Sequence, residues 1–126
     1  MPDAVTILAV DDSATMRRII RNGLRAVGYE AVLEAENGRA GLAKLRRAAV
    51  DVVITDWAMP VMGGLEMVRA IRSNPATRHL PVLMIAAGGR QDDIDEALEA
   101  GITGYIATPF EAETLHRKVQ QALGQS

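Results

Sequence analysis

The stretch VTILAVDDS, residues 5–13, decides the fold that this sequence predicts. Its first six residues, 5–10, form a short apolar run with β-branched side chains, which is typical of a strand buried on both faces. Two aspartates follow directly, and Ser13 then opens a segment with apolar residues at helical spacing up to Val27. A buried strand that passes through a polar turn into an amphipathic helix is one β–α unit of a parallel sheet.

The same unit recurs along the chain. Strands are expected at 5–10, 31–35, 51–56, 81–86 and 104–107, and helices at 13–27, 38–48, 65–72, 91–100 and 111–123. Continuously apolar strands need cover on both faces of their sheet. The pattern therefore predicts the α/β class, with a doubly wound, five-stranded parallel sheet in a flavodoxin-like (βα)5 arrangement. A closed barrel of this type would need eight repeats.

Composition narrows the classes of function. With 126 residues, we expect one domain covering 1–126. The absence of cysteine excludes disulfides, thiolate metal sites and a cysteine nucleophile. A formal net charge of -2 and 3% aromatic residues give no indication of DNA or single-stranded nucleic acid as a partner. No apolar run is long enough to span a membrane, so we expect a cytoplasmic protein.

Three acidic residues are expected at one edge of the sheet. Asp11 and Asp12 follow the first strand, and Asp56 closes the third. These strands are neighbours in a flavodoxin-like order, so the three carboxylates would share a pocket and raise each other's pKa. Oxygen-only ligands favour Mg2+ or a similar hard cation. The alternative is that each aspartate caps a helix or stabilises a turn, and for Asp12, beside Ser13, capping is the favoured interpretation.

Several short segments, in this order and spacing, carry a family resemblance. They are Asp11-Asp12, Asp56-Trp57-Ala58-Met59-Pro60 with Gly63-Gly64, Leu80-Pro81-Val82-Leu83-Met84, Gly104-Tyr105-Ile106 and Pro109-Phe110. The chain resembles, from end to end, the receiver domain of bacterial two-component response regulators, in the single-domain form known from chemotaxis. The resemblance implies that Asp56 accepts a phosphoryl group from a histidine kinase. It also implies that Asp11, Asp12, Asp56 and the backbone carbonyl of Ala58 hold Mg2+, and that the Thr108–Pro109 peptide bond is cis.

Two positions depart from the family pattern. Ala86 stands where the family carries a Thr or Ser that contacts the phosphoryl group, and Thr108 stands where it carries a Lys. Tyr105 keeps the aromatic position that is coupled to that hydroxyl. A methyl group donates no hydrogen bond, and threonine supplies no positive charge, so the hydroxyl of the family's switch and the positive charge of its lysine are both absent.

Several functions remain open. We favour an altered receiver that takes phosphoryl groups from a sensor histidine kinase or phosphotransfer protein. It would act as a monomer by docking to an output protein such as the flagellar switch. The alternatives are a pseudo-receiver that binds a protein whatever its phosphorylation state, or a domain tuned to another ligand. A flavodoxin-type redox carrier is disfavoured, because Asp11 and Asp12 would repel the flavin phosphate.

Arginines recur on the first predicted helix and follow the fourth strand. Arg17, Arg21 and Arg25 lie four residues apart and form a stripe, which we expect to be the solvated face of the helix. Arg90, after Gly88-Gly89, is likewise expected in solvent.

Overall fold

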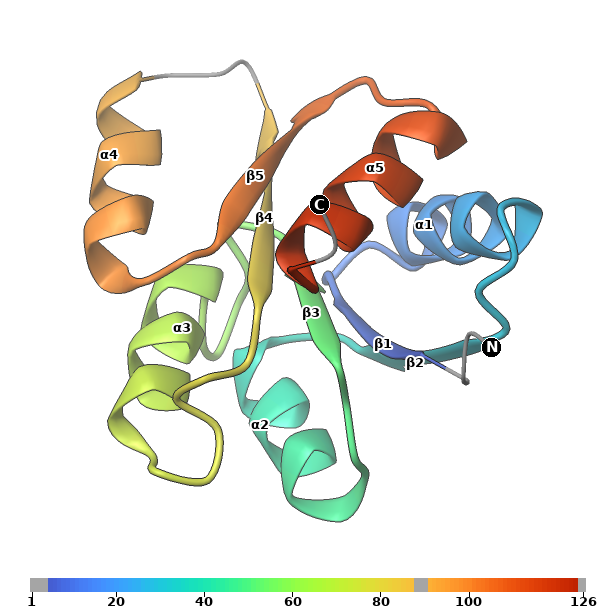
Figure 1. The fold of residues 1–126 in the computed structure, drawn as a ribbon. Coiled ribbons are helices and arrows are strands. Elements are labelled where there is room, and N and C mark those ends of the chain that lie inside the picture. The colour runs from blue at the N-terminus through green and yellow to red at the C-terminus, as the bar shows by residue number, and fades with distance from the viewer. Residues whose placement is uncertain (1–4, 88–90, 125–126) are drawn as a thin grey trace.

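The computed structural model describes residues 5–87 and 91–124, so the expectation for Arg90 lies outside the described residues. Strands and helices alternate along the chain (Figure 1). They are β1 (Thr6–Val10), α1 (Ala14–Ala26), β2 (Ala31–Ala35), α2 (Gly38–Arg47), β3 (Val52–Thr55), α3 (Gly64–Ser73), β4 (Val82–Ala87), α4 (Gln91–Ala100), β5 (Gly104–Thr108) and α5 (Ala112–Ala122). The predicted boundaries agree to within one or two residues, and β5 runs one residue further than expected, through Thr108.

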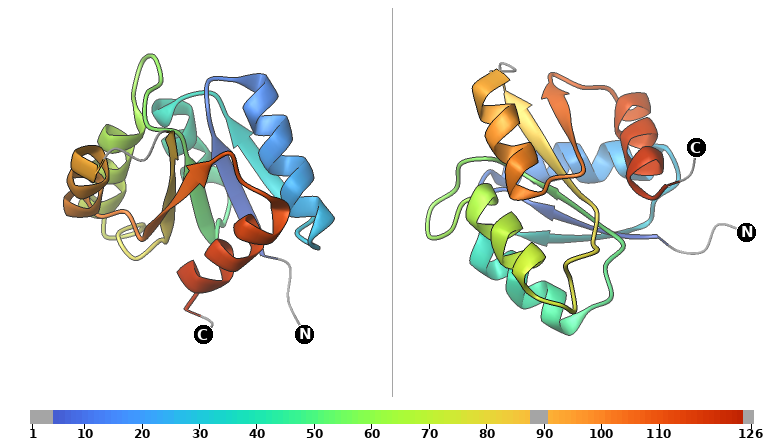
Figure 2. Two further views of the ribbon diagram at one scale, coloured as in Figure 1. Left: turned by 90° about the horizontal axis from the view of Figure 1, so that it is seen from above. Right: turned by 60° about the vertical axis from the view of Figure 1, so that its left-hand side comes forward.

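The five strands form one parallel sheet in the order β2-β1-β3-β4-β5. This confirms the doubly wound α/β class and its flavodoxin-like strand order. Since β1 and β3 are adjacent, the loops that follow them emerge side by side at the carboxyl edge of the sheet (Figure 2). The Thr108–Pro109 peptide bond is cis, as the resemblance implied.

Alternate side chains of the central strands enter two separate hydrophobic clusters. On β1, Leu8 and Val10 pack with residues of α2, α3 and α4, whereas Ile7 and Ala9 pack with α1 and α5. All four are fully buried. Full burial of a Leu or Ile side chain contributes roughly 1.5–3 kcal/mol. The central strands are therefore held from both faces, and their carboxyl ends have fixed positions.

The start of β1 and the end of α5 lie at the edge opposite the loops that follow β1 and β3 (Figure 2). Val5 packs against the same cluster as Ala122 and Leu123. Within 5–87 and 91–124, no helix has both the length and the apolar character of a membrane span.

Candidate functional site

The pairing of β1 with β3 positions two of the predicted acids. Val10 pairs with Thr55, so Asp11 and Asp56 are the next residues on adjacent strands. The Asp56 N–H donates to the Val10 carbonyl at 2.9 Å, and the Asp11 N–H donates to the Ala35 carbonyl of β2 at 3.0 Å. Backbone hydrogen bonds therefore continue past the strand ends and hold both residues in register.

The structure brings the three predicted carboxylates together. Asp11, Asp12 and Asp56 each offer an oxygen, and these oxygens all lie within 4.8 Å of one another. Asp11 is 3% exposed, Asp56 is half-buried, and Asp12 is exposed to solvent. A group of carboxylate oxygens with one side open to water suits a hard cation such as Mg2+, which keeps several of its waters. The donor set therefore fits the ion that the sequence predicted.

Burial and mutual repulsion disfavour ionisation in this cluster. Burial is the main cause that raises the pKa of Asp11 to about 6, and the charges of Asp56 and Asp12 add to it. A hydrogen bond from the Ser13 N–H to Asp11 Oδ1, at 2.8 Å, opposes this rise. Burial also raises the pKa of Asp56, against a hydrogen bond from the Trp57 N–H at 2.8 Å and with repulsion from Asp12. A cation at this site would remove the repulsion.

The residue that caps helix α1 is Ser13, not Asp12. The Ser13 hydroxyl oxygen accepts the Met16 N–H at 3.1 Å, which makes Ser13 the N-cap of α1. The interpretation of Asp12 as the helix cap is therefore wrong, and its carboxylate belongs to the acidic cluster instead.

The loop between β3 and α3 approaches Asp56 closely. The Gly64 N–H donates to the Trp57 carbonyl at 2.9 Å, and a Cβ atom at Gly64 would overlap the Asp56 carbonyl oxygen. Glycine at this position therefore lets α3 begin directly behind Asp56. Val61 lies in the same loop with φ at 70°, a conformation that β-branched residues rarely adopt.

A cavity of about 220 Å³ opens beside Asp56. Its lining is mostly apolar and comes from the loop after β3, from β4, from α4 and the turn that follows it, and from β5: Asp56, Trp57, Ala58, Met84, Ile85, Ala86, Asp93, Ile94, Ala97, Ile102 and Tyr105. The cavity thus brings Asp56 together with Ala58 and with two of the three predicted switch positions. Thr108 does not line it, and pairs with Ala87 at the end of β5. The Tyr105 side chain is partly exposed, with Lys118 Nζ 5.3 Å from its ring centroid.

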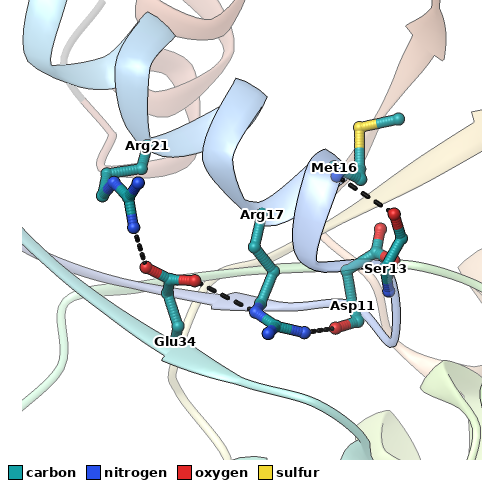
Figure 3. Close-up of polar contacts among 6 residues, drawn as sticks. All are labelled: Asp11, Ser13, Met16, Arg17, Arg21 and Glu34. Carbon is teal, nitrogen blue, oxygen red and sulfur yellow. Dashed lines mark hydrogen bonds and ion pairs between the residues drawn. The ribbon is translucent and has the colours of Figure 1, made fainter.

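Sequence reasoning missed Glu34, which lies on β2 and binds two arginines of α1. Its Oε1 accepts from Arg17 Nε at 3.0 Å, and its Oε2 pairs with Arg21 Nη1 at 2.5 Å (Figure 3). Burial disfavours its ionisation, but the hydrogen bonds from Arg21 and Arg17 outweigh this and lower the pKa of Glu34. The expectation that the stripe faces solvent is therefore wrong for these two arginines, while Arg25 is exposed. The regular arginine spacing was the available signal, but nothing in the sequence indicated the partner.

Comparisons with known proteins agree with this geometry. The family model for the response regulator receiver domain matches residues 7–120. The chemotaxis protein CheY of Pseudomonas aeruginosa is 44% identical over 115 residues, which cover 91% of this chain and 93% of that protein. The solved structure of the Vibrio cholerae chemotaxis protein CheY4 has a TM-score of 0.89 at 37% identity, covering 96% of this chain and 100% of that one.

A further solved structure is that of the receiver domain of a sensor histidine kinase from Pseudomonas aeruginosa. It is described with a magnesium ion coordinated in its active-site cleft. It is 30% identical, has a TM-score of 0.88 and covers 97% of this chain and 99% of that one. The family match, the identity to CheY and the shared fold lead to one conclusion: this chain belongs to the response regulator receiver domain family and is a CheY-like response regulator of two-component signalling.

Proposed function

We propose that the chain accepts a phosphoryl group on Asp56 from a histidine kinase or phosphotransfer protein, with Mg2+, and signals by docking to an output protein. The observation that carries the proposal is the acidic cluster, whose three carboxylates lie within 4.8 Å of one another. Such a cluster is electrostatically costly without a cation, as the raised pKa values of Asp11 and Asp56 indicate. A module that only bound proteins would gain nothing from it.

Asp56 is the nucleophile in this proposal. One of its carboxylate oxygens attacks the phosphorus of a phosphohistidine, and the O–P bond forms as the N–P bond breaks. The imidazole leaves with the bonding electrons and takes up a proton. The hydrogen bond from the Trp57 N–H to Asp56 Oδ1 fixes the carboxylate and leaves its other oxygen for the attack.

Mg2+ would be held by Asp11, Asp12, Asp56 and the backbone carbonyl of Ala58. When bound, it supplies positive charge that neutralises the acids and the phosphoryl oxygens. Asp12 is exposed, so the ion and a donor reach the cluster from solvent. The magnesium ion described for the related receiver domain supports this ligand chemistry.

The partners follow from the same family. Receiver domains interact with histidine kinases and downstream effectors, and the chemotaxis relatives favour a flagellar switch as the output partner. We propose that residues 1–126 act as one receiver unit in the cytoplasm. Ala86 contributes only a methyl group to the cavity beside Asp56, so phosphorylation would alter the output surface less than in relatives that carry a hydroxyl there.

A second candidate function is a pseudo-receiver that binds its partner whatever its phosphorylation state. The apolar lining of the cavity beside Asp56, with Ala86 in its wall, favours this alternative. It predicts that the Asp56→Asn variant binds the output partner as tightly as the wild type.

The deciding experiment is incubation with Mg2+ and acetyl phosphate, followed by intact-mass spectrometry. We expect one added phosphoryl group on the wild type, no adduct when Mg2+ is chelated, and none on Asp56→Asn. Trp57 lines the cavity with Asp56, so its fluorescence would report the same event. A wild type that binds Mg2+ but forms no adduct would contradict phosphotransfer and favour the pseudo-receiver.

A further inference from the structure

We propose that Arg17 is a positioning residue for the cation site, and that Glu34 holds it in place from the neighbouring strand. This inference rests on the proposed function, because it assumes that the acidic cluster binds Mg2+. It assigns a role to a basic residue that would, as a bare charge, oppose cation binding.

The first support is the contact between Arg17 and the turn that carries the acids. Arg17 Nη1 donates to the backbone carbonyl oxygen of Asp11 at 2.5 Å (Figure 3). The backbone N–H of Arg17 also donates to the backbone carbonyl of Ser13 at 3.0 Å, within the first turn of α1. The Arg17 side chain therefore connects Asp11, the residue directly after β1, to helix α1. Asp12 lies between these two anchored residues.

The second support is the fixation of the guanidinium itself. Arg17 Nε pairs with Glu34 Oε1, and Arg17 Nη1 donates to the Asp11 carbonyl. One planar group therefore contacts β2 and the turn after β1 at the same time. Arg21 Nη1 occupies the other oxygen of Glu34. The side chains of Arg17 and Glu34 are only 18% and 28% exposed. Their geometry is therefore fixed by β2 and α1 rather than by solvent.

The sign of the effect on Mg2+ affinity separates positioning from simple electrostatics. A guanidinium near a divalent cation repels it, so removal of the charge alone would tighten Mg2+ binding. Loss of the anchor would let the Asp11–Asp12 turn move and would weaken binding. Lysine keeps the charge but cannot reproduce two directed contacts from one planar group, so Arg17→Lys isolates the geometric contribution.

The experiment measures Mg2+ affinity by isothermal titration calorimetry, with Trp57 fluorescence as a second readout. The variants are Arg17→Lys and Arg17→Gln, with Arg25→Lys and Arg25→Gln as matched controls from the exposed end of the same stripe. Thermal unfolding without Mg2+ is recorded for each variant. We expect Arg17→Lys to bind Mg2+ about 10-fold more weakly, as is common when a residue that orients metal ligands is lost. Arg17→Gln should lose less affinity, because it also removes the charge that repels the ion. The Arg25 variants should match the wild type.

A double-mutant cycle tests the role of Glu34: Mg2+ affinity is also measured for Glu34→Gln and for the double variant Arg17→Lys/Glu34→Gln. If Glu34 acts through Arg17, the losses of affinity in the two single variants will not add in the double variant. Additive losses of Mg2+ affinity would mean that Glu34 does not act through Arg17, and this part of the proposal would be wrong.

Three outcomes would overturn the inference. Tighter binding by Arg17→Gln with unchanged binding by Arg17→Lys would mean that Arg17 acts only by its charge. Lower melting temperatures with unchanged Mg2+ affinity would mean that it only stabilises the fold. A wild type and Arg25 variants that do not bind Mg2+ would contradict the proposed cation site itself, and the inference would fail with it.

Discussion

Asp11→Asn is expected to stabilise the cation-free protein at neutral pH and not in acid. The pKa of Asp11 is raised from 3.8 to about 6 in the folded state, so the folded protein binds more protons than the unfolded chain between these values. The free energy of unfolding therefore falls as the pH rises through this window. A shift of ~2 pKa units at ~1.4 kcal/mol per unit amounts to about 3 kcal/mol above pH 6.

The asparagine variant removes this penalty and keeps an oxygen for the Ser13 N–H, which now donates to Asp11 Oδ1. We expect its free energy of unfolding to exceed that of the wild type by about 3 kcal/mol at pH 7.5, or about 10 °C in Tm for a domain of this size. Below pH 4 the folded wild type is already protonated, and the difference should disappear.

The assay is urea or thermal unfolding in a chelating buffer at pH 4 and pH 7.5, with the exposed Glu30→Gln as the control. Addition of Mg2+ at pH 7.5 should then stabilise the wild type more than Asp11→Asn. The reasoning would be refuted if the variant differed from the wild type equally at both pH values, or if it were the less stable protein at pH 7.5.

The remaining predictions concern packing and the departures from the family pattern. Leu24→Ala, at a fully buried position, should cost about 2–5 kcal/mol in urea unfolding, whereas Ile19→Ala on the exposed side of the same helix should change little. Gly64→Ala places a methyl against the Asp56 carbonyl and should cost about 1–3 kcal/mol, with a shifted Asp56 amide resonance in NMR. Thr108→Lys should restore a charge near the phosphoryl group and tighten binding of the phosphoryl analogue beryllofluoride by at least ~10-fold. Unchanged affinity would show that the end of β5 does not face the phosphoryl group.

The fold follows from patterns that a sequence displays directly. Five alternations of a buried strand and an amphipathic helix leave few topologies, and the β1–β3 pairing then places Asp11 and Asp56 side by side. The convergence of the acids was therefore predictable, since it depends only on strand ends and strand order.

Features that depend on side-chain packing between distant elements were not predictable. Glu34 lies in a strand whose sequence gives no hint of the arginines that cross over it from α1. The sequence does not distinguish the N-cap of α1, because two adjacent polar residues, Asp12 and Ser13, both suit that position and backbone geometry decides between them. The cavity beside Asp56 is formed between residues of α4, β4 and β5. Its shape depends on how these elements pack, and no short stretch of sequence predicts that packing.

The position of the start of β1 and the end of α5 has a practical consequence for building a sensor from this domain. β1 begins and α5 ends at the edge of the sheet away from the acids, and Val5 packs in one cluster with Ala122 and Leu123. A fluorescent protein fused beyond either end, or a tether to a surface, would leave the acidic edge open to small donors. Two fluorophores attached at Val5 and Leu123, which pack against one hydrophobic cluster, would start close together, so energy transfer between them would report their separation as the domain unfolds.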